Sequence, residues 1–182
     1  MKRKILNELL STGLYLLVVL ALTWLLITYV IQRTEVDGSS MEPTLQSGDN
    51  LFVDKISYRF RDPERFDIIV FPFRYKENTY YIKRIIGMPG ETVRIDIDGN
   101  IYINDEKLDE SYGKEVIHAT NIGRAINAIQ LGEDEYFVMG DNRNNSSDSR
   151  FESVGNIKRK EIIGRAWVRI WPFNKVGVLK HQ

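Results

Sequence analysis

The sequence predicts a mostly-β fold, in which a single N-terminal transmembrane helix precedes one domain built as a twisted antiparallel β-sheet or partial barrel. Three observations support this prediction. Residues 9–31 form a run of 23 residues without a charged side chain. The rest of the chain consists of short β-type runs separated by turn signals, without long helical periodicity. Residues 94–103 carry a hairpin pattern.

The uncharged run is the expected membrane anchor. At about 1.5 Å per residue, a helix over residues 9–31 covers the roughly 30 Å hydrocarbon layer of a bilayer. Residues 2–4 are all basic, and the residues after the run are neutral or acidic apart from Arg33. The positive-inside rule therefore places residues 1–8 in the cytoplasm and residues 32–182 outside it.

Two other interpretations of the run are a cleaved signal peptide and a buried core helix. A signal peptide has an apolar stretch of about 7–15 residues before a small-x-small cleavage site. Here the run is longer, and the one weak candidate site, Ala21-Leu22-Thr23, lies inside it. A core helix needs a polar face, which this run lacks. We therefore expect a retained, single-pass anchor in the cell membrane.

The region after the anchor is expected to be one domain of strands. Within the hairpin pattern, Arg94 to Ile97 alternates between polar and apolar residues, Asp98-Gly99 forms a turn, and Asn100 to Ile103 alternates again. Tyr112 to Ile129 is polar and irregular, and we interpret it as a loop. The expected strands are Asn50 to Ile56, Asp67 to Phe73, Thr79 to Ile86, Glu91 to Ile97, Asn100 to Ile103, Tyr136 to Met139 and Ile162 to Trp171.

Composition excludes several classes of function. Lys plus Arg equals Asp plus Glu at 25 each, so the chain lacks the basic surplus of a nucleic-acid-binding protein. There are no cysteines and only two histidines, His118 and His181. We therefore expect no disulfide, no thiol chemistry, no metal site and no cofactor.

The first segment whose residues could take part in catalysis runs from Asp37 to Leu45 and begins six residues after the anchor. Small residues before Ser40 let backbone N–H groups approach a substrate carbonyl, and Pro43 fixes the turn that follows. Ser40 is a candidate nucleophile on this pattern. Taken alone, the segment is equally typical of a plain Gly-Ser turn.

Two further segments suggest how such a serine could be activated. Lys83 interrupts an apolar strand, where it is either an edge lysine that discourages aggregation or a desolvated base. Burial lowers the pKa of lysine by up to about 3–5 units, which provides the neutral amine that a base needs. Residues 140–150 are all polar or Gly, and form either a solvated loop or a hydrogen-bond network.

Together, these segments resemble bacterial type I signal peptidases (leader peptidases), in the short form that is similar to the Gram-positive enzymes. The resemblance extends from the anchor to about Phe173. It lies in a nucleophile box, Ser40-Met41-x-Pro43-Thr44, in a lysine box, Tyr81-Ile82-Lys83-Arg84 with Gly87-x-Pro89-Gly90, and in a third box, Gly140-Asp141-Asn142-Arg143 with Ser146, Asp148, Ser149 and Arg150.

The resemblance implies roles for individual residues. Ser40 would be the nucleophile and Lys83 its general base, and the hydroxyl of Ser146 would orient the lysine. The backbone N–H of Ser40 would stabilise the oxyanion. Some relatives supply a second donor from a serine hydroxyl two residues earlier, where this chain has Gly38. The second donor therefore stays open, with the Gly38 backbone N–H or a water molecule as the candidates. Asp148 would form a structural ion pair with Arg84 or Arg150.

The resemblance also implies a substrate. The family removes signal peptides from secretory preproteins at the membrane surface, after small residues at the −1 and −3 positions. Membrane lipid would be the second partner, and neither nucleic acid nor metal would be needed. The residues expected to line the two pockets are Val36, Met41, Leu45, Leu51, Val70, Tyr81 and Ile82.

Three other functions are compatible with parts of the sequence. An inactive, membrane-anchored β scaffold that binds peptides or proteins explains the anchor and strands, but not why Ser40, Lys83 and Ser146 all match the family. A Ser–Lys autoprotease like the self-cleaving repressors would not need the anchor and would carry a DNA-binding domain. A hydrolase based on His118 or His181 would rely on an irregular segment or on the penultimate residue. The peptidase interpretation is favoured.

Overall fold

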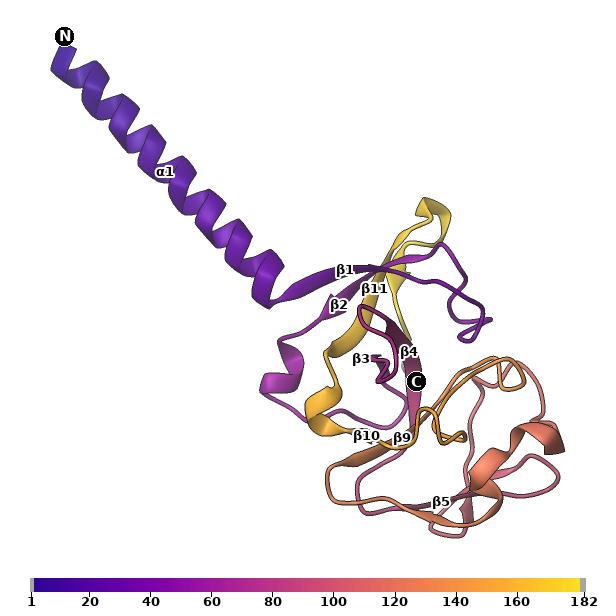
Figure 1. Ribbon diagram of the computed structural model, residues 1–182. Coiled ribbons are helices and arrows are strands. Elements are labelled where there is room, and N and C mark those ends of the chain that lie inside the picture. Colours follow the sequence, from indigo (N-terminus) through magenta and orange to yellow (C-terminus); the bar gives the residue numbers. More distant parts are fainter. Residues whose placement is uncertain (1, 181–182) are drawn as a thin grey trace.

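The computed structural model describes residues 2–180 and shows one long helix beside a mostly-β domain (Figure 1). Met1 of the expected cytoplasmic segment, together with His181 and Gln182, lies outside the described residues. The prediction of a mostly-β antiparallel fold behind one N-terminal apolar helix is confirmed.

The helix α1 spans Lys2–Tyr29 and projects away from the domain in Figure 1. It is long and apolar enough to cross a membrane between Arg3 and Leu25. Every side chain described between residues 3 and 25 is exposed, so the domain does not cover this apolar surface. The helix ends earlier than the predicted residue 31, because Ile31 pairs with Asp54 in a strand.

The larger sheet has eight strands, and all of its neighbouring strands run antiparallel. Their order is β1-β2-β11-β3-β4-β9-β10, with β12 paired to β11. The strands are β1 (Ile31–Glu35), β2 (Asn50–Asp54), β3 (Ile68–Pro72), β4 (Tyr80–Gly87), β9 (Glu135–Met139), β10 (Ile157–Lys158), β11 (Gly164–Trp171) and β12 (Gly177–Val178).

A smaller sheet of four strands follows the order β7-β6-β5-β8. The predicted hairpin forms its centre, where Arg94 of β5 lies opposite Tyr102 of β6. Gly99 in the turn has φ of +82°, a left-handed conformation that glycine adopts without strain. The strands are β5 (Thr92–Ile95), β6 (Ile101–Ile103), β7 (Glu106–Lys107) and β8 (Ile129–Gln130).

The segment from Tyr112 to Ile129 is more ordered than the predicted irregular loop. It contains two short 3-10 helices, η2 (Ala119–Asn121) and η3 (Gly123–Ile126). Ile117, Ile122 and Ala125 are buried against the smaller sheet in one apolar cluster. Their spacing does not match a regular helix or strand, so the sequence pattern does not reveal this packing. Three further 3-10 turns are η1 (Ser57–Arg59), η4 (Arg159–Glu161) and η5 (Phe173–Lys175).

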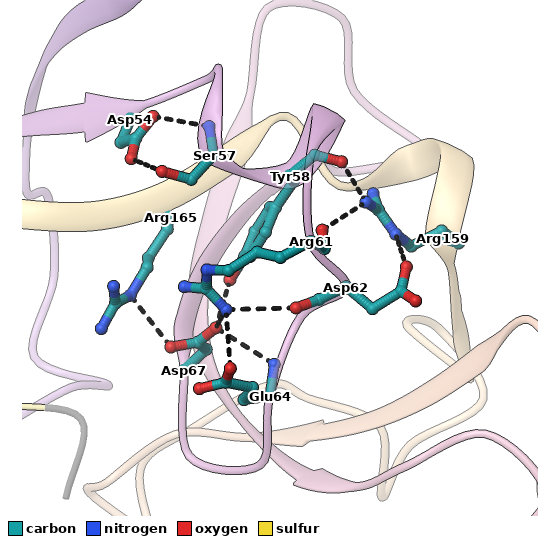
Figure 2. Close-up of polar contacts among 9 residues, drawn as sticks. All are labelled: Asp54, Ser57, Tyr58, Arg61, Asp62, Glu64, Asp67, Arg159 and Arg165. Atoms are coloured by element: carbon teal, nitrogen blue, oxygen red, sulfur yellow. Dashed lines mark hydrogen bonds and ion pairs between the residues drawn. The ribbon is translucent and has the colours of Figure 1, made fainter.

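A buried ionic network fixes the segment between β2 and β3 (Figure 2). The carboxylate of Asp67, which is 1% exposed, accepts a hydrogen bond from the Tyr58 hydroxyl at 2.8 Å and one from Arg61 at 3.2 Å. It also forms an ion pair with Arg165 of β11 at 2.9 Å. The network therefore joins this segment to β11 and sets where β3 enters the sheet beside β4.

Candidate active site

Ser40 and Lys83 meet although 43 positions separate them in the chain. Ser40 lies in the loop between β1 and β2, and Lys83 lies in β4. The Nζ atom of Lys83 is 2.8 Å from the Oγ atom of Ser40. This is hydrogen-bond distance, which a serine and its general base need for proton transfer.

Lys83 is buried, with 4% of the residue's surface exposed. Desolvation lowers its pKa from 10.5 to about 8, although the nearby carboxylates of Asp148 and Asp141 act to raise it. The Arg150 guanidinium acts with desolvation to lower the pKa. At pH 7, about a tenth of a group with this pKa is neutral, compared with roughly one in 3,000 for a free lysine.

Lys83 reaches Ser40 because of strand alternation. Tyr81, Lys83 and Ile85 project to one face of β4, since side chains of a strand point to alternate faces. The Nζ atom lies 5.0 Å from the centre of the Tyr81 ring, and Phe73 stacks on that ring at 4.6 Å. The aromatic pair therefore packs beside the lysine amine.

Arg84 projects to the opposite face and is also fully buried. It forms a two-pronged ion pair with Asp141, with contacts of 2.8 and 2.7 Å. Arg150 forms a similar pair with Asp148, at 2.8 Å for both contacts. Of the two partners that the resemblance left open for Asp148, the structure selects Arg150. Asp141 of the third box is the partner of Arg84.

A groove of about 450 Å³ opens at the two residues. One side is the chain from β1 to Ser40, and the other is β4. Residues 80–83 of β4 pair with β3 on one edge, whereas pairing with β9 begins only at Arg84. The second edge of residues 80–83 is therefore open toward the groove.

Four of the seven expected pocket residues line this groove: Val36, Val70, Tyr81 and Ile82. The other three, Met41, Leu45 and Leu51, are at most 1% exposed and do not line it. They belong to the apolar cluster that packs with Val36 and Ile82. In the structure they therefore support the lining residues from below.

A family model described as "Signal peptidase, peptidase S26" matches residues 9–171, which is most of the chain. The chain belongs to this signal peptidase family.

Similar relatives carry the same description in their names. The chain is 44% identical over 157 residues to "Probable signal peptidase I-2" of Synechocystis sp., covering 84% of this chain and 68% of that one. It is 36% identical over 166 residues to "Signal peptidase I P" of Bacillus subtilis subsp. natto, covering 88% of each. A crystal structure of a signal peptidase I from Enterococcus faecalis is 32% identical, with a TM-score of 0.46, over 58% of this chain and 97% of that chain.

Ser146, the third side chain that resembles the signal peptidase pattern, lies against residues 36–49, the loop that carries Ser40. We call this loop the nucleophile loop, after the role that the resemblance implies for Ser40. The Ser146 Oγ atom is buried and has no hydrogen-bond partner among the described residues. A side chain at Gly140 would collide with this hydroxyl and with the Ser40 carbonyl. Gly140 is therefore required for the close approach of the third box to Ser40, although no hydrogen bond joins Ser146 to Lys83 in the described part of the chain.

The third box also holds the nucleophile loop through hydrogen bonds that the sequence alone did not predict. The backbone N–H of Asn142 donates to the Ser40 carbonyl at 3.0 Å, and its side-chain amide donates to the Ser39 carbonyl at 3.1 Å. The Thr44 hydroxyl donates to Asp141 at 2.6 Å. The motifs contain all of these residues, but only the fold reveals which pairs touch.

Gly38 has φ of +100° and open space around its Cα atom. Its N–H donates to the Ser47 hydroxyl at 3.2 Å, within the same loop. This N–H, which was one candidate for the second oxyanion donor, is therefore already engaged. Within residues 2–180, the N–H of Ser40 itself donates to no acceptor.

Proposed function

We propose that this signal peptidase family member is a serine endopeptidase that removes N-terminal signal peptides from secreted preproteins. Ser40 is the nucleophile and Lys83 is the general base. The observation that carries the proposal is the buried amine of Lys83, held 2.8 Å from the Ser40 hydroxyl oxygen at the edge of a groove. A lysine in a water-excluded site is neutral often enough to accept the serine proton.

The reaction proceeds through two halves. The Ser40 oxygen attacks the scissile carbonyl carbon, its proton moves to Nζ of Lys83, and the carbonyl electron pair moves onto the oxygen. When this intermediate collapses, the C–N bond breaks and the lysine ammonium protonates the leaving amine. A water molecule then attacks the acyl-enzyme with Lys83 as base, which releases the signal peptide and restores Ser40.

Ser146 is the proposed lysine-orienting residue. Its hydroxyl is buried and unpartnered beside the nucleophile loop, so it can accept a hydrogen bond when Lys83 becomes an ammonium ion. Such a bond favours the charged form during the step in which the lysine carries the proton. The pair of Asp148 and Arg150 holds the loop that carries Ser146.

The substrate is proposed to lie extended in the groove and to pair with the open edge of residues 80–83, as a β-strand added to the sheet. Side chains of an extended peptide alternate, so those at −1 and −3 point to the same face. Val36, Val70 and Ile82 lie at that face, with Met41, Leu45 and Leu51 beneath them. The tight apolar packing favours small residues at both positions.

The anchor places this chemistry at a membrane. We propose that α1 crosses the cell membrane with its basic N-terminus in the cytoplasm, and that the domain works on the outer side against membrane lipid. Secreted preproteins expose their cleavage sites on that side. The β1 strand leaves the helix two residues after its end and leads directly to the nucleophile loop, so the site stays near the surface.

The test is cleavage by the full-length protein in detergent of a preprotein with a small-x-small site, followed by sequencing of the new N-terminus. The wild-type protein is expected to cut after the second small residue. Ser40→Ala removes the nucleophile, and Lys83→Arg replaces the base by a group that does not deprotonate in proteins, so both should be inactive. Substantial cleavage by Lys83→Arg, or none by the wild type, would contradict the proposal.

A further inference from the structure

The Ser39 hydroxyl lies next to the proposed nucleophile, Ser40, in the groove. Ser39 and Asn145 both line the groove that contains Ser40 and Lys83. The side-chain amide of Asn145 donates a hydrogen bond to the Ser39 Oγ atom at 2.9 Å. Asn145 comes from the third box, 106 residues later in the chain, so this contact is formed only by the fold.

The contact with Asn145 leaves the Ser39 hydroxyl free to donate a hydrogen bond. A serine hydroxyl is one donor and can accept two hydrogen bonds. Asn145 uses an acceptor position of Ser39, and the Ser39 O–H group donates to no partner within residues 2–180. The hydroxyl is half-exposed in the groove, so the hydrogen is available to a group that enters it.

The peptide bond beside it is held in one orientation. The Ser39 carbonyl accepts hydrogen bonds from the Asn142 side chain and from the Glu42 N–H, both at 3.1 Å. In a trans peptide the N–H points opposite to the carbonyl. The Ser40 N–H is therefore directed away from the third box and, like the Ser39 hydroxyl, it donates to no acceptor in the described part of the chain.

The other neighbouring donor is occupied. The Gly38 N–H donates to the Ser47 hydroxyl at 3.2 Å, and glycine has no side-chain donor. An acyl-transfer site with one oxyanion donor works far below its capacity, because each donor is worth about 10²–10³ in rate. Of the two side chains adjacent to Ser40 in the sequence, Ser39 and Met41, only that of Ser39 carries a donor, and this hydroxyl donates to no partner within residues 2–180.

We propose that the Ser39 hydroxyl is the second oxyanion donor of this site, and that Asn145 is the positioning residue that orients it. This inference rests on the proposed function, since it concerns the tetrahedral intermediate formed by Ser40. When the carbonyl electron pair moves onto the oxygen, the Ser40 N–H and the Ser39 O–H donate to it together. The Asn145 amide donates a hydrogen bond to the Ser39 Oγ atom, so the hydrogen of the Ser39 hydroxyl points away from that amide and into the groove.

Reversing the polarity of Asn145 tests this directly. Asn145→Asp has almost the same shape, but a carboxylate only accepts. The Ser39 hydroxyl would then donate to Asp and lose its free hydrogen, while the contact between the two side chains would persist. A purely structural clamp tolerates this change. An oriented donor does not.

The experiment measures kcat and KM of the full-length protein in detergent with one preprotein, at a pH above 9 where Lys83 is largely neutral. We expect Ser39→Ala to lower kcat about 100-fold with little change in KM. Ser39→Thr, which keeps a hydroxyl, should retain most of the activity. Asn145→Asp should lose as much as Ser39→Ala. The matched control Ser153→Ala, at an exposed serine outside the groove, should stay within a few-fold of the wild type.

The double variant separates orientation from charge. If the carboxylate acts through the hydroxyl, Ser39→Ala with Asn145→Asp is no slower than either single variant. Multiplicative losses would show that the new charge acts on its own, and would overturn the role of Asn145. Wild-type kcat in Ser39→Ala would overturn the role of Ser39, while the proposed function stands as long as the wild type cleaves and Ser40→Ala does not. Failure of the wild type to cleave would overturn both.

Discussion

The pH dependence of cleavage follows from the environment of Lys83. In the proposed mechanism only its neutral amine accepts the Ser40 proton, and burial lowers its pKa to about 8. Because the folded pKa is depressed, the neutral fraction is about 1% at pH 6, about 50% at pH 8 and about 90% at pH 9. The rate should therefore rise roughly 50-fold between pH 6 and pH 8, and then less than about twofold above that.

The assay is initial-rate cleavage of a preprotein by the full-length protein in detergent, with kcat/KM measured from pH 6 to pH 10. A thermal melt at each pH shows that the protein stays folded. The plateau is the decisive feature, because an ordinary lysine would let the rate climb steadily toward pH 10.5. A rate that is flat across the range, or that still rises tenfold between pH 9 and pH 10, would refute the assignment of Lys83 as a desolvated base.

Two further predictions concern stability and the close approach of loops. Lys83→Met should stabilise the fold at pH 7 by about 3 kcal/mol, because it removes a lysine whose pKa is lowered from 10.5 to about 8, at about 1.4 kcal/mol per pKa unit. The melting temperatures of the two proteins should converge near pH 10.5, where the lysine is neutral in both the folded and the unfolded chain. Equal melting temperatures at pH 7 would contradict this prediction. Gly140→Ala should reduce cleavage strongly and destabilise the fold by about 1–3 kcal/mol, because the methyl group meets the Ser146 hydroxyl and the Ser40 carbonyl; a normal rate and melt would show that the loop moves aside.

The longer strands were predictable from the sequence because each carries its own pattern. All seven expected strands appear, with ends shifted by a few residues at most. Strands β7, β8, β10 and β12 have two residues each, too few to show alternation. Strand β1 was missed for a different reason. Ile31 continues the apolar run of the anchor, and the four residues after it are polar, as expected for an exposed edge.

The candidate site was predictable as a set of residues but not as a set of contacts. Ser40 alone was no better than a turn serine, and its partner in space could be inferred only through the family resemblance. The pairing of Arg84 with Asp141 illustrates the limit, because two buried aspartates in the same loop were equally suitable by sequence. Which carboxylate faces which guanidinium depends on the path of residues 140–148 over β4.

The open edge of β4 has a consequence for how tightly a peptide can be held. Residues 80–83 offer about four outward backbone groups, because alternate residues of a strand turn theirs to the other edge. One of them, the Ile82 carbonyl, already accepts a hydrogen bond from the Lys83 amine at 3.0 Å. At about 0.5–1.5 kcal/mol net for each hydrogen bond, backbone pairing contributes at most roughly 2–6 kcal/mol, which corresponds to dissociation constants between about 30 mM and about 40 μM. This backbone contribution does not depend on the side chains of the peptide, so any selection for small residues at −1 and −3 must come from the groove. Peptides that differ outside those two positions can therefore use the same pairing.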